Sequence, residues 1–289
     1  MYKKNSMERT KCLLIFLFIG IYTVQASYKD RIYSAYISGN MQEWKLVIDA
    51  MEERSITNPD FIADLLNYQY GYIGYRRWWW SRIVFRKSIY KSRFFNWKQY
   101  EKAVISSYTS ALYGFEIGIS SWKAPIVGPA SLESAQNAIS YDSLNYLGYV
   151  QYGHTQFYMP EVFGGSKKLA LQNYHKAETF LEYNKRALVS DWNFFRSLVV
   201  IAQAYEKVDE LQKAQTYYEK ILRIEPDFLW GADTLYPQLL EKMKWLYSLF
   251  IYVWIYCITV FFKLLKTKNM KNVLIVGAGG LGVPAIQYL

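Results

Sequence analysis

Residues 198–226, LVVIAQAYEKVDELQKAQTYYEKILRIEP, decide the fold because they contain two amphipathic segments on either side of a short polar turn. The apolar residues of the first segment recur with the i, i+3, i+4, i+7 spacing of one helical face: Leu198, Ile201, Ala202 and Tyr205. The apolar face of the second segment has three residues: Ala214, Tyr218 and Ile221. Pro226 then ends the second helix, because proline cannot continue it. The sequence therefore predicts a pair of helices joined by a tight turn.

The order and spacing of these residue types resemble the tetratricopeptide repeat. That family has a large apolar residue, an apolar–small pair, an aromatic, a small residue, a second aromatic and a proline at these positions. Ile221 departs from the pattern, since a small residue is usual there. The resemblance implies that Ala202 and Ala214 let the paired helices approach closely, while Tyr205 and Tyr218 fill the space between them.

An altered copy of the pattern precedes this unit, so the resemblance covers about residues 130–226 and weakens upstream. The copy is carried by six residues: Leu144, Leu147 and Gly148 in a first helix, and Ala170, Tyr174 and Ala177 in a second. Roughly ten extra residues separate its helices and include Pro160 and the pair Gly164-Gly165. A proline followed by a double glycine is similar to the periplasmic T-component proteins of tripartite transporters. An ordinary long loop with a glycine turn is the alternative.

Two fainter helix pairs lie further upstream. Residues 32–51 contain a break at Gly39, after which three residues share one helical face: Trp44, Ile48 and Met51. Residues 61–75 and 97–115 are expected to form another pair around a long insertion. One repeat cannot bury its own apolar face, and about three are needed for a stable stack. Residues 27–244 are therefore expected to form an all-α helical-repeat solenoid.

Two apolar segments predict export and membrane anchoring. Residues 1–26 have a basic start, a short apolar stretch and a small-residue site ending at Ala26, which is typical of a cleaved signal peptide. Residues 245–265 open with 18 uncharged residues, WLYSLFIYVWIYCITVFF. At 1.5 Å per residue this run is about 27 Å long, close to the hydrocarbon thickness of a bilayer. The segment is therefore predicted to be a transmembrane helix, with a buried core helix as the alternative.

The charge around the second apolar segment predicts its orientation. Four lysines follow it closely: Lys263, Lys266, Lys268 and Lys271. Because positive charge stays on the cytoplasmic side, residues 266–289 are expected to be a cytoplasmic tail. The signal peptide independently predicts that residues 27–244 lie outside the cytoplasm. We therefore expect a single-pass membrane protein.

The composition excludes several classes of protein. Aromatic residues make up 19% and hydrophobic residues 52% of the chain, so it is not a disordered protein. Cys12 and Cys257 are the only cysteines, one in each apolar segment, which excludes a disulfide framework or a cysteine-based zinc site between those segments. The formal charge of +10 suits an anionic membrane surface, nucleic acid or an acidic partner.

The long insertion combines basic and aromatic residues. Six of them are candidates for a ligand-binding or membrane-binding surface: Arg76, Arg77, Trp78, Trp79, Trp80 and Arg82. Arginine beside exposed aromatics suits an anionic membrane surface, an acidic ligand or a nucleic-acid backbone. An exported, tethered protein meets lipid more readily than nucleic acid, so we expect no nucleic-acid partner. The alternative is that the aromatic residues pack in the core and the basic residues face solvent.

Patterns of catalytic residues are lacking in residues 27–244. Nucleophile elbows, paired-carboxylate motifs and Walker-type phosphate loops are missing from these residues. His154 and His175 have no cluster of metal-ligating residue types beside them, so structural roles are expected. We predict no catalytic residue, metal or cofactor in this region.

The C-terminal residues carry a different pattern. Gly277, Gly279 and Gly282 match G-x-G-x-x-G between a predicted strand and a predicted helix. The string NVLIVGAGGLGVPAIQYL, residues 272–289, resembles the opening of the ThiF/MoeB/HesA family. The resemblance implies a Rossmann-like start and, in a complete domain, ATP and magnesium for adenylating small ubiquitin-like proteins. The family's downstream residues are absent, so we expect a read-through or truncated start of an enzyme that does not use ATP as it stands.

These observations favour a membrane-anchored binding or scaffold protein whose helical repeats contact a protein or peptide. The first alternative is the N-terminal part of a ThiF/MoeB/HesA-type adenylyltransferase. The second, which rests on the insertion before Gly165, is a transporter accessory protein that binds small ligands.

Overall fold

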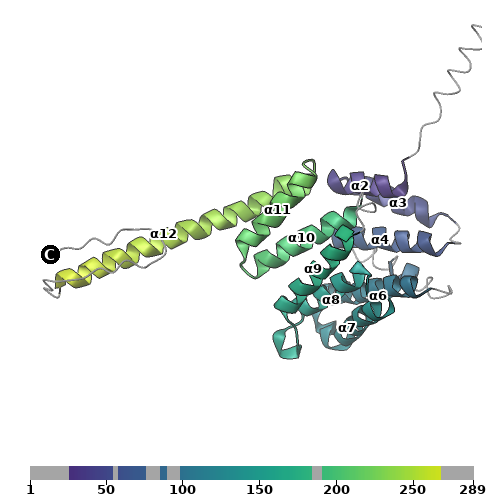
Figure 1. Ribbon diagram of the computed structural model, residues 1–289, viewed down its shortest axis with the longest axis horizontal. Coiled ribbons are helices and arrows are strands. Elements are labelled where there is room, and N and C mark those ends of the chain that lie inside the picture. Colours follow the sequence, from purple (N-terminus) through teal and green to yellow (C-terminus); the bar gives the residue numbers. More distant parts are fainter. Residues whose placement is uncertain (1–25, 55–57, 76–84, 90–97, 184–190, 268–289) are drawn as a thin grey trace, which may run out of the picture. The chain divides into compact units, whose positions relative to one another are not determined.

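The computed structural model describes residues 26–54, 58–75, 85–89, 98–183 and 191–267, and all regular structure in these ranges is helical (Figure 1). The predicted all-α class is thus confirmed for this part of the chain. The predicted strand and glycine motif of residues 272–289, and residues 1–25 of the predicted signal peptide, lie outside the described ranges. The main helices are α2 (Tyr28–Ile37), α3 (Met41–Glu52), α4 (Pro59–Tyr75), α6 (Gln99–Ile119), α7 (Ala124–Tyr141), α8 (Tyr146–Tyr158), α9 (Lys167–Tyr183), α10 (Trp192–Lys207), α11 (Leu211–Ile224) and α12 (Tyr236–Thr267).

The helix pair formed by α10 and α11 matches the pair predicted from the pattern in residues 198–226. Ala202 and Ala214 have no exposed surface, and Tyr218 is 1% exposed, so the alanines allow the close approach and the ring fills the remaining space. Tyr205 differs from the expectation. It is half-buried, and its hydroxyl lies 2.8 Å from Nε2 of His175, so it links α10 to α9.

The altered copy corresponds to α8 and α9. The ring of Tyr174 on α9 lies against Gly153 on α8, where a Cβ would come within 2.4 Å of the ring, so the close approach requires glycine. The expected place of Leu144 on the first helix is wrong, because α8 begins at Tyr146 and Leu144 is 69% exposed. The side chain of Asn145 accepts a hydrogen bond from a backbone N–H of the first turn and starts the helix there.

The extra residues between α8 and α9 form a compact turn. A short 3-10 helix covers Glu161–Phe163, and Gly164 follows with a left-handed φ of 92°. A Cβ at Gly165 would overlap the carbonyl group of Met159, so the second glycine is needed for space. The loop with a glycine turn is therefore what the structure contains.

The N-terminal half is built from α2, α3, α4, α6 and α7. Gly39 forms the turn between α2 and α3 with a φ of 68°, which confirms the expected break. The main neighbour of α6 is α7, a helix that the sequence analysis did not single out. Pro125 lies in the first turn, where a missing N–H costs little. The hydroxyl of Ser131 donates to the carbonyl oxygen of Ser110 at 3.0 Å, which marks the close contact of α7 with α6.

The stack of helices curves until its first pair contacts its last. Each helix from α2 to α10 contacts the next in chain order, and α10 contacts α2 again. The hydroxyl of Tyr33 donates to Glu225 at 2.6 Å, which joins α2 to the end of α11. The ring centroid of Trp192 on α10 lies 5.7 Å from the ring centroid of Tyr36 and 5.0 Å from that of Trp44. The contact between α2 and α10 buries aromatic surface. In an open stack, capping repeats would have to cover such surface.

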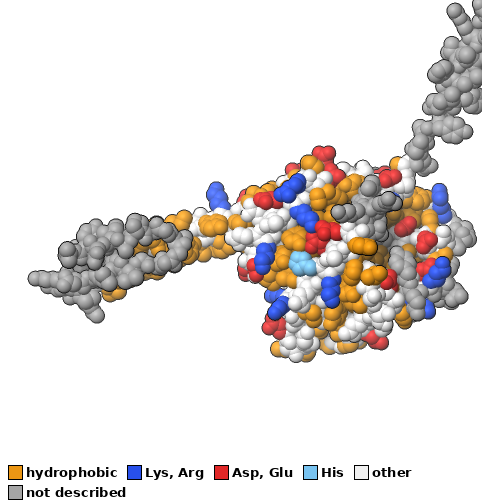
Figure 2. Space-filling model, viewed as in Figure 1, with side chains coloured by type: hydrophobic (Ala, Val, Ile, Leu, Met, Phe, Trp, Pro, Cys, Tyr) orange, Lys and Arg blue, Asp and Glu red, His pale blue; other side chains and the backbone are white. Residues whose placement is uncertain are grey.

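Residues 237–267 of α12 belong to a second unit. Its large side chains are exposed, among them Phe250 (64%), Tyr252 (70%) and Trp254 (58%), and Figure 2 shows hydrophobic side chains along the helix. Among the described residues, one helical stretch, Gly231–Leu264, is long and apolar enough to cross a membrane. The core helix of a soluble protein, which was the alternative, would be mostly buried. No residue in the most apolar window of this stretch is buried.

Candidate functional site: a polar network across three helices

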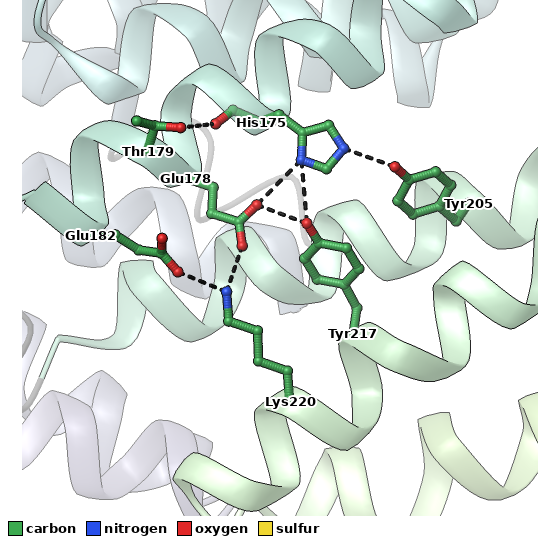
Figure 3. A network of polar contacts seen from close by, with 7 residues as sticks. All are labelled: His175, Glu178, Thr179, Glu182, Tyr205, Tyr217 and Lys220. Carbon is green, nitrogen blue, oxygen red and sulfur yellow. Dashed lines mark hydrogen bonds and ion pairs between the residues drawn. The ribbon is translucent and has the colours of Figure 1, made fainter.

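A network of polar side chains joins α9, α10 and α11 (Figure 3). His175 and Glu178 come from α9, Tyr205 from the end of α10, and Tyr217 and Lys220 from α11. Residues at i and i+3 share one face of a helix, which directs His175 and Glu178 toward the same neighbours. Figure 3 shows the carboxylate of Glu178 at the centre of the network.

Both carboxylate oxygens of Glu178 have donors. Tyr217 donates its hydroxyl hydrogen to Oε2 at 2.8 Å, Lys220 Nζ donates to Oε1 at 2.7 Å, and His175 Nδ1 lies 3.2 Å from Oε2. The side chain is 10% exposed, and burial by itself disfavours the charged form. The three contacts outweigh burial and lower the pKa of Glu178 to about 2. Glu178 is therefore a carboxylate at neutral pH.

Aromatic rings surround His175. The ring centroids of Tyr205 and Tyr217 lie 5.9 and 6.0 Å from the imidazole, and Lys220 Nζ lies 5.8 Å from the Tyr217 centroid. Burial and the hydrogen bond to Glu178 raise the pKa of the Tyr217 hydroxyl. The hydroxyl therefore keeps its proton and serves as a donor.

The geometry suits binding and positioning. An ionised carboxylate whose oxygens already accept several hydrogen bonds is a weak proton acceptor. The hydroxyl of Thr179, next to Glu178, donates to the carbonyl oxygen of His175 at 2.9 Å. The His175 and Lys220 side chains are 38% and 34% exposed, so the network reaches the surface. Tyrosine rings beside a lysine offer a partner both apolar contact and hydrogen bonds.

The low pKa of Glu178 predicts an acid-sensitive contribution to stability. A carboxyl whose folded pKa is about 2 and whose ordinary value is 4.5 stabilises the fold fully above about pH 4.5 and loses this contribution as the pH falls toward 2. The contribution is about 3 kcal/mol, at about 1.4 kcal/mol per unit. Urea unfolding of the full chain in detergent, followed by circular dichroism between pH 6 and pH 3, measures it.

Two variants test this assignment. Glu178→Gln is expected to unfold at lower urea concentration at pH 6 and to show a shallower loss of stability below pH 4.5. Glu182→Gln is the matched control, because its side chain also contacts Lys220 but is 44% exposed. It should cost less than about 1 kcal/mol. Equal behaviour of the two variants would contradict the assignment.

The predicted basic and aromatic surface can be placed only in part. The six candidate residues lie outside the described residues: Arg76, Arg77, Trp78, Trp79, Trp80 and Arg82. Further along the insertion, Phe85 is fully buried in a cluster with Ile62 and Tyr108. Arg86 forms an ion pair with Glu116 of α6. Phe85 therefore packs in the core, as the alternative expected for the aromatic residues. Arg86 pairs with a carboxylate from another helix.

The network itself was not expected from the sequence. His175, Glu178 and Glu182 have the spacing i, i+3 and i+7, which was the available signal for one polar helical face. Tyr217 and Lys220 lie 39 and 42 residues after Glu178, so only the packing of α9 against the last helix pair brings them together. The described residues contain no group of three or more side chains that could hold a metal ion.

Comparison with known proteins gives no family for the chain. No protein-family model matches it, and no curated protein matches its sequence. Among solved structures, the crystal structure of MamA protein is similar with a TM-score of 0.32 and 17% identity, over 72% of this chain and 94% of that chain. A likeness at this level assigns neither a family nor a function.

Proposed function

We propose that the chain is a membrane-anchored scaffold whose stacked helix pairs bind a protein or peptide partner. The observation that carries this proposal is the uncharged run of residues 245–262 on α12. No residue in the most apolar window of this helical stretch is buried. Apolar surface of this extent is unfavourable in water and is stabilised by transfer into hydrocarbon. The run is long enough to cross a bilayer once.

The lysines after this run support an orientation with the helix pairs outside the cytoplasm. Lys263 and Lys266 lie one and four residues after Phe262, and positive charge is retained on the cytoplasmic side. The helix pairs would then meet partners in the exported compartment while α12 keeps them at the membrane.

The surface around the polar network is the partner-binding face in this proposal. Lys213 Nζ lies 5.4 Å from the ring centroid of Tyr205, and Tyr205 and Tyr217 lie 5.9 Å apart. Tyrosine contributes large contact area at low cost in conformational entropy. Stacked helix pairs present such side chains as an extended binding surface.

Site-specific photocrosslinking tests this face. Benzoylphenylalanine in place of Lys213 is expected to yield one discrete adduct in cells that make the full chain. Lys45 on α3 is the matched control, since the two lysine side chains are 56% and 57% exposed and each pairs with an acid on or next to its own helix. The proposal fails if Lys213 gives no adduct, or if both positions give the same one.

A further inference from the structure

The turn between α8 and α9 exposes large apolar side chains to solvent. Tyr158, Val162 and Phe163 are 77%, 86% and 74% exposed, although they lie within six residues of one another. The turn projects beyond the ends of the two helices that it joins (Figure 1). Single exposed apolar side chains are ordinary, whereas a cluster of them marks an interaction site.

The backbone of this turn is hydrogen-bonded within the chain. The N–H groups of Phe163 and Gly165 donate to the carbonyl oxygen of Pro160 at 2.9 and 3.2 Å. The N–H group of Gly164 donates to the carbonyl oxygen of Glu161 at 2.9 Å. Unpaired backbone groups oppose entry into hydrocarbon, because lipid offers them no partner. A turn that pairs these N–H groups internally can leave water at a lower cost.

The turn between α6 and α7 lies at the same edge of the helical stack. Four residues join α6 to α7, and four join α7 to α8. Linkers this short make neighbouring helices antiparallel, so the ends of α6 and α8 lie on the same side. Trp122 and Ile126, in and just after the α6–α7 turn, are 69% and 68% exposed. Exposed apolar side chains therefore come from two turns at one edge.

The same edge carries an excess of positive charge. Lys123 directly precedes α7, and Lys167 and Lys168 begin α9. Glu161 is the one acid in the two turns, residues 119–126 and 158–168. Helix N-termini favour acids, because the macrodipole places partial positive charge there. Lysines at the starts of α7 and α9 add to that charge, so this edge complements an anionic surface.

We propose that this edge, formed by the α6–α7 and α8–α9 turns, docks on an anionic lipid surface, with Val162 and Phe163 inserted among the acyl chains. Lysine is depleted in protein interfaces, whereas lysines beside exposed aromatic side chains are typical of surfaces that contact lipid. The inference rests on the proposed membrane anchor. A tether to the bilayer raises the effective concentration of lipid, so that weak docking suffices.

Quenching of a fluorescent thiol label by doxyl-labelled phosphatidylcholine tests the docking. The full chain is reconstituted in vesicles of phosphatidylglycerol and phosphatidylcholine, and Val162→Cys with Cys12→Ser and Cys257→Ser carries the label at the tip. Tyr183→Cys in the same background is the matched control, because Tyr183 is 93% exposed at the other end of α9. The label at position 162 is expected to be quenched at least about twofold more strongly than at position 183. Equal quenching at the two positions, as a protein partner for this edge would give, overturns the proposal.

The native Cys257 on α12 separates failure of the docking from failure of the anchor. Labelled in a Cys12→Ser chain, this exposed thiol is expected to be quenched by the same lipid, whether or not the edge docks. Quenching at position 257 without quenching at position 162 would overturn the docking alone. Absence of quenching at both positions would overturn the anchor as well.

Two comparisons test the apolar and the charged contributions to docking. Phe163→Glu in the Val162→Cys chain is expected to reduce quenching at position 162 by about half or more, because a carboxylate opposes insertion. Leu144→Glu is the matched control, since Leu144 is 69% exposed in the turn between α7 and α8 at the opposite edge. In vesicles of phosphatidylcholine alone, quenching at position 162 is also expected to fall by about half or more, because the lysines lose their anionic partner. Unchanged quenching in Phe163→Glu, or equal quenching with and without phosphatidylglycerol, would overturn the proposal.

Discussion

Replacing Tyr218 with alanine is expected to lower the free energy of unfolding by about 3–5 kcal/mol. The ring is 1% exposed between α10 and α11. Its neighbours Ala202 and Ala214 are too small to fill the space that loss of the ring would leave. Its hydroxyl also donates to Glu206 at 2.5 Å. The substitution therefore creates a cavity and removes one hydrogen bond to a carboxylate.

Urea unfolding of the full chain in detergent, followed by circular dichroism, measures this loss. Tyr218→Phe separates the two contributions, since it keeps the ring and removes only the hydrogen bond, at a cost of about 1–3 kcal/mol. Tyr183→Ala is the matched control, because that tyrosine is 93% exposed and its replacement should cost within about 0.5 kcal/mol. Equal costs for Tyr218→Ala and Tyr183→Ala would show that the helix pair is not packed as described.

The sequence was sufficient to predict the local helix pairs. Ala202, Ala214 and Tyr218 are small and aromatic residues at fixed helical spacing, and each is buried as expected. Gly39 has the positive φ that its place in a turn predicts. These features depend on neighbours within one helix pair, so periodicity and turn chemistry determine them.

The long-range contacts were not predictable from the sequence. Trp44 and Trp192 are far apart in the chain, and nothing in their local spacing indicates that closure of the stack brings their rings within 5.0 Å. The same holds for the Glu178 network, whose members meet only because α9 packs beside α10 and α11. The helix α7 was not singled out from the sequence, and it contains Pro129 in its interior against the usual preference.

Placing two lysines in the uncharged run of α12 is expected to abolish membrane anchoring. Ile251 and Ile255 are 55% and 51% exposed and one helical turn apart near the middle of the run. Each change from isoleucine to lysine near the centre of a spanning helix costs about 3–4 kcal/mol of insertion free energy. The double variant Ile251→Lys, Ile255→Lys should therefore leave the membrane fraction. The matched control is Ile119→Lys, Ile126→Lys, the same changes at exposed positions in and at the end of other helices.

Alkaline carbonate extraction of membranes from cells that make the full chain tests the central claim most directly. The account predicts that the wild-type chain and the Ile119→Lys, Ile126→Lys control stay in the membrane pellet. The Ile251→Lys, Ile255→Lys variant is predicted to appear in the supernatant. Extraction of the wild-type chain, or retention of the α12 variant in the pellet, would contradict a helical stack held at the membrane by α12.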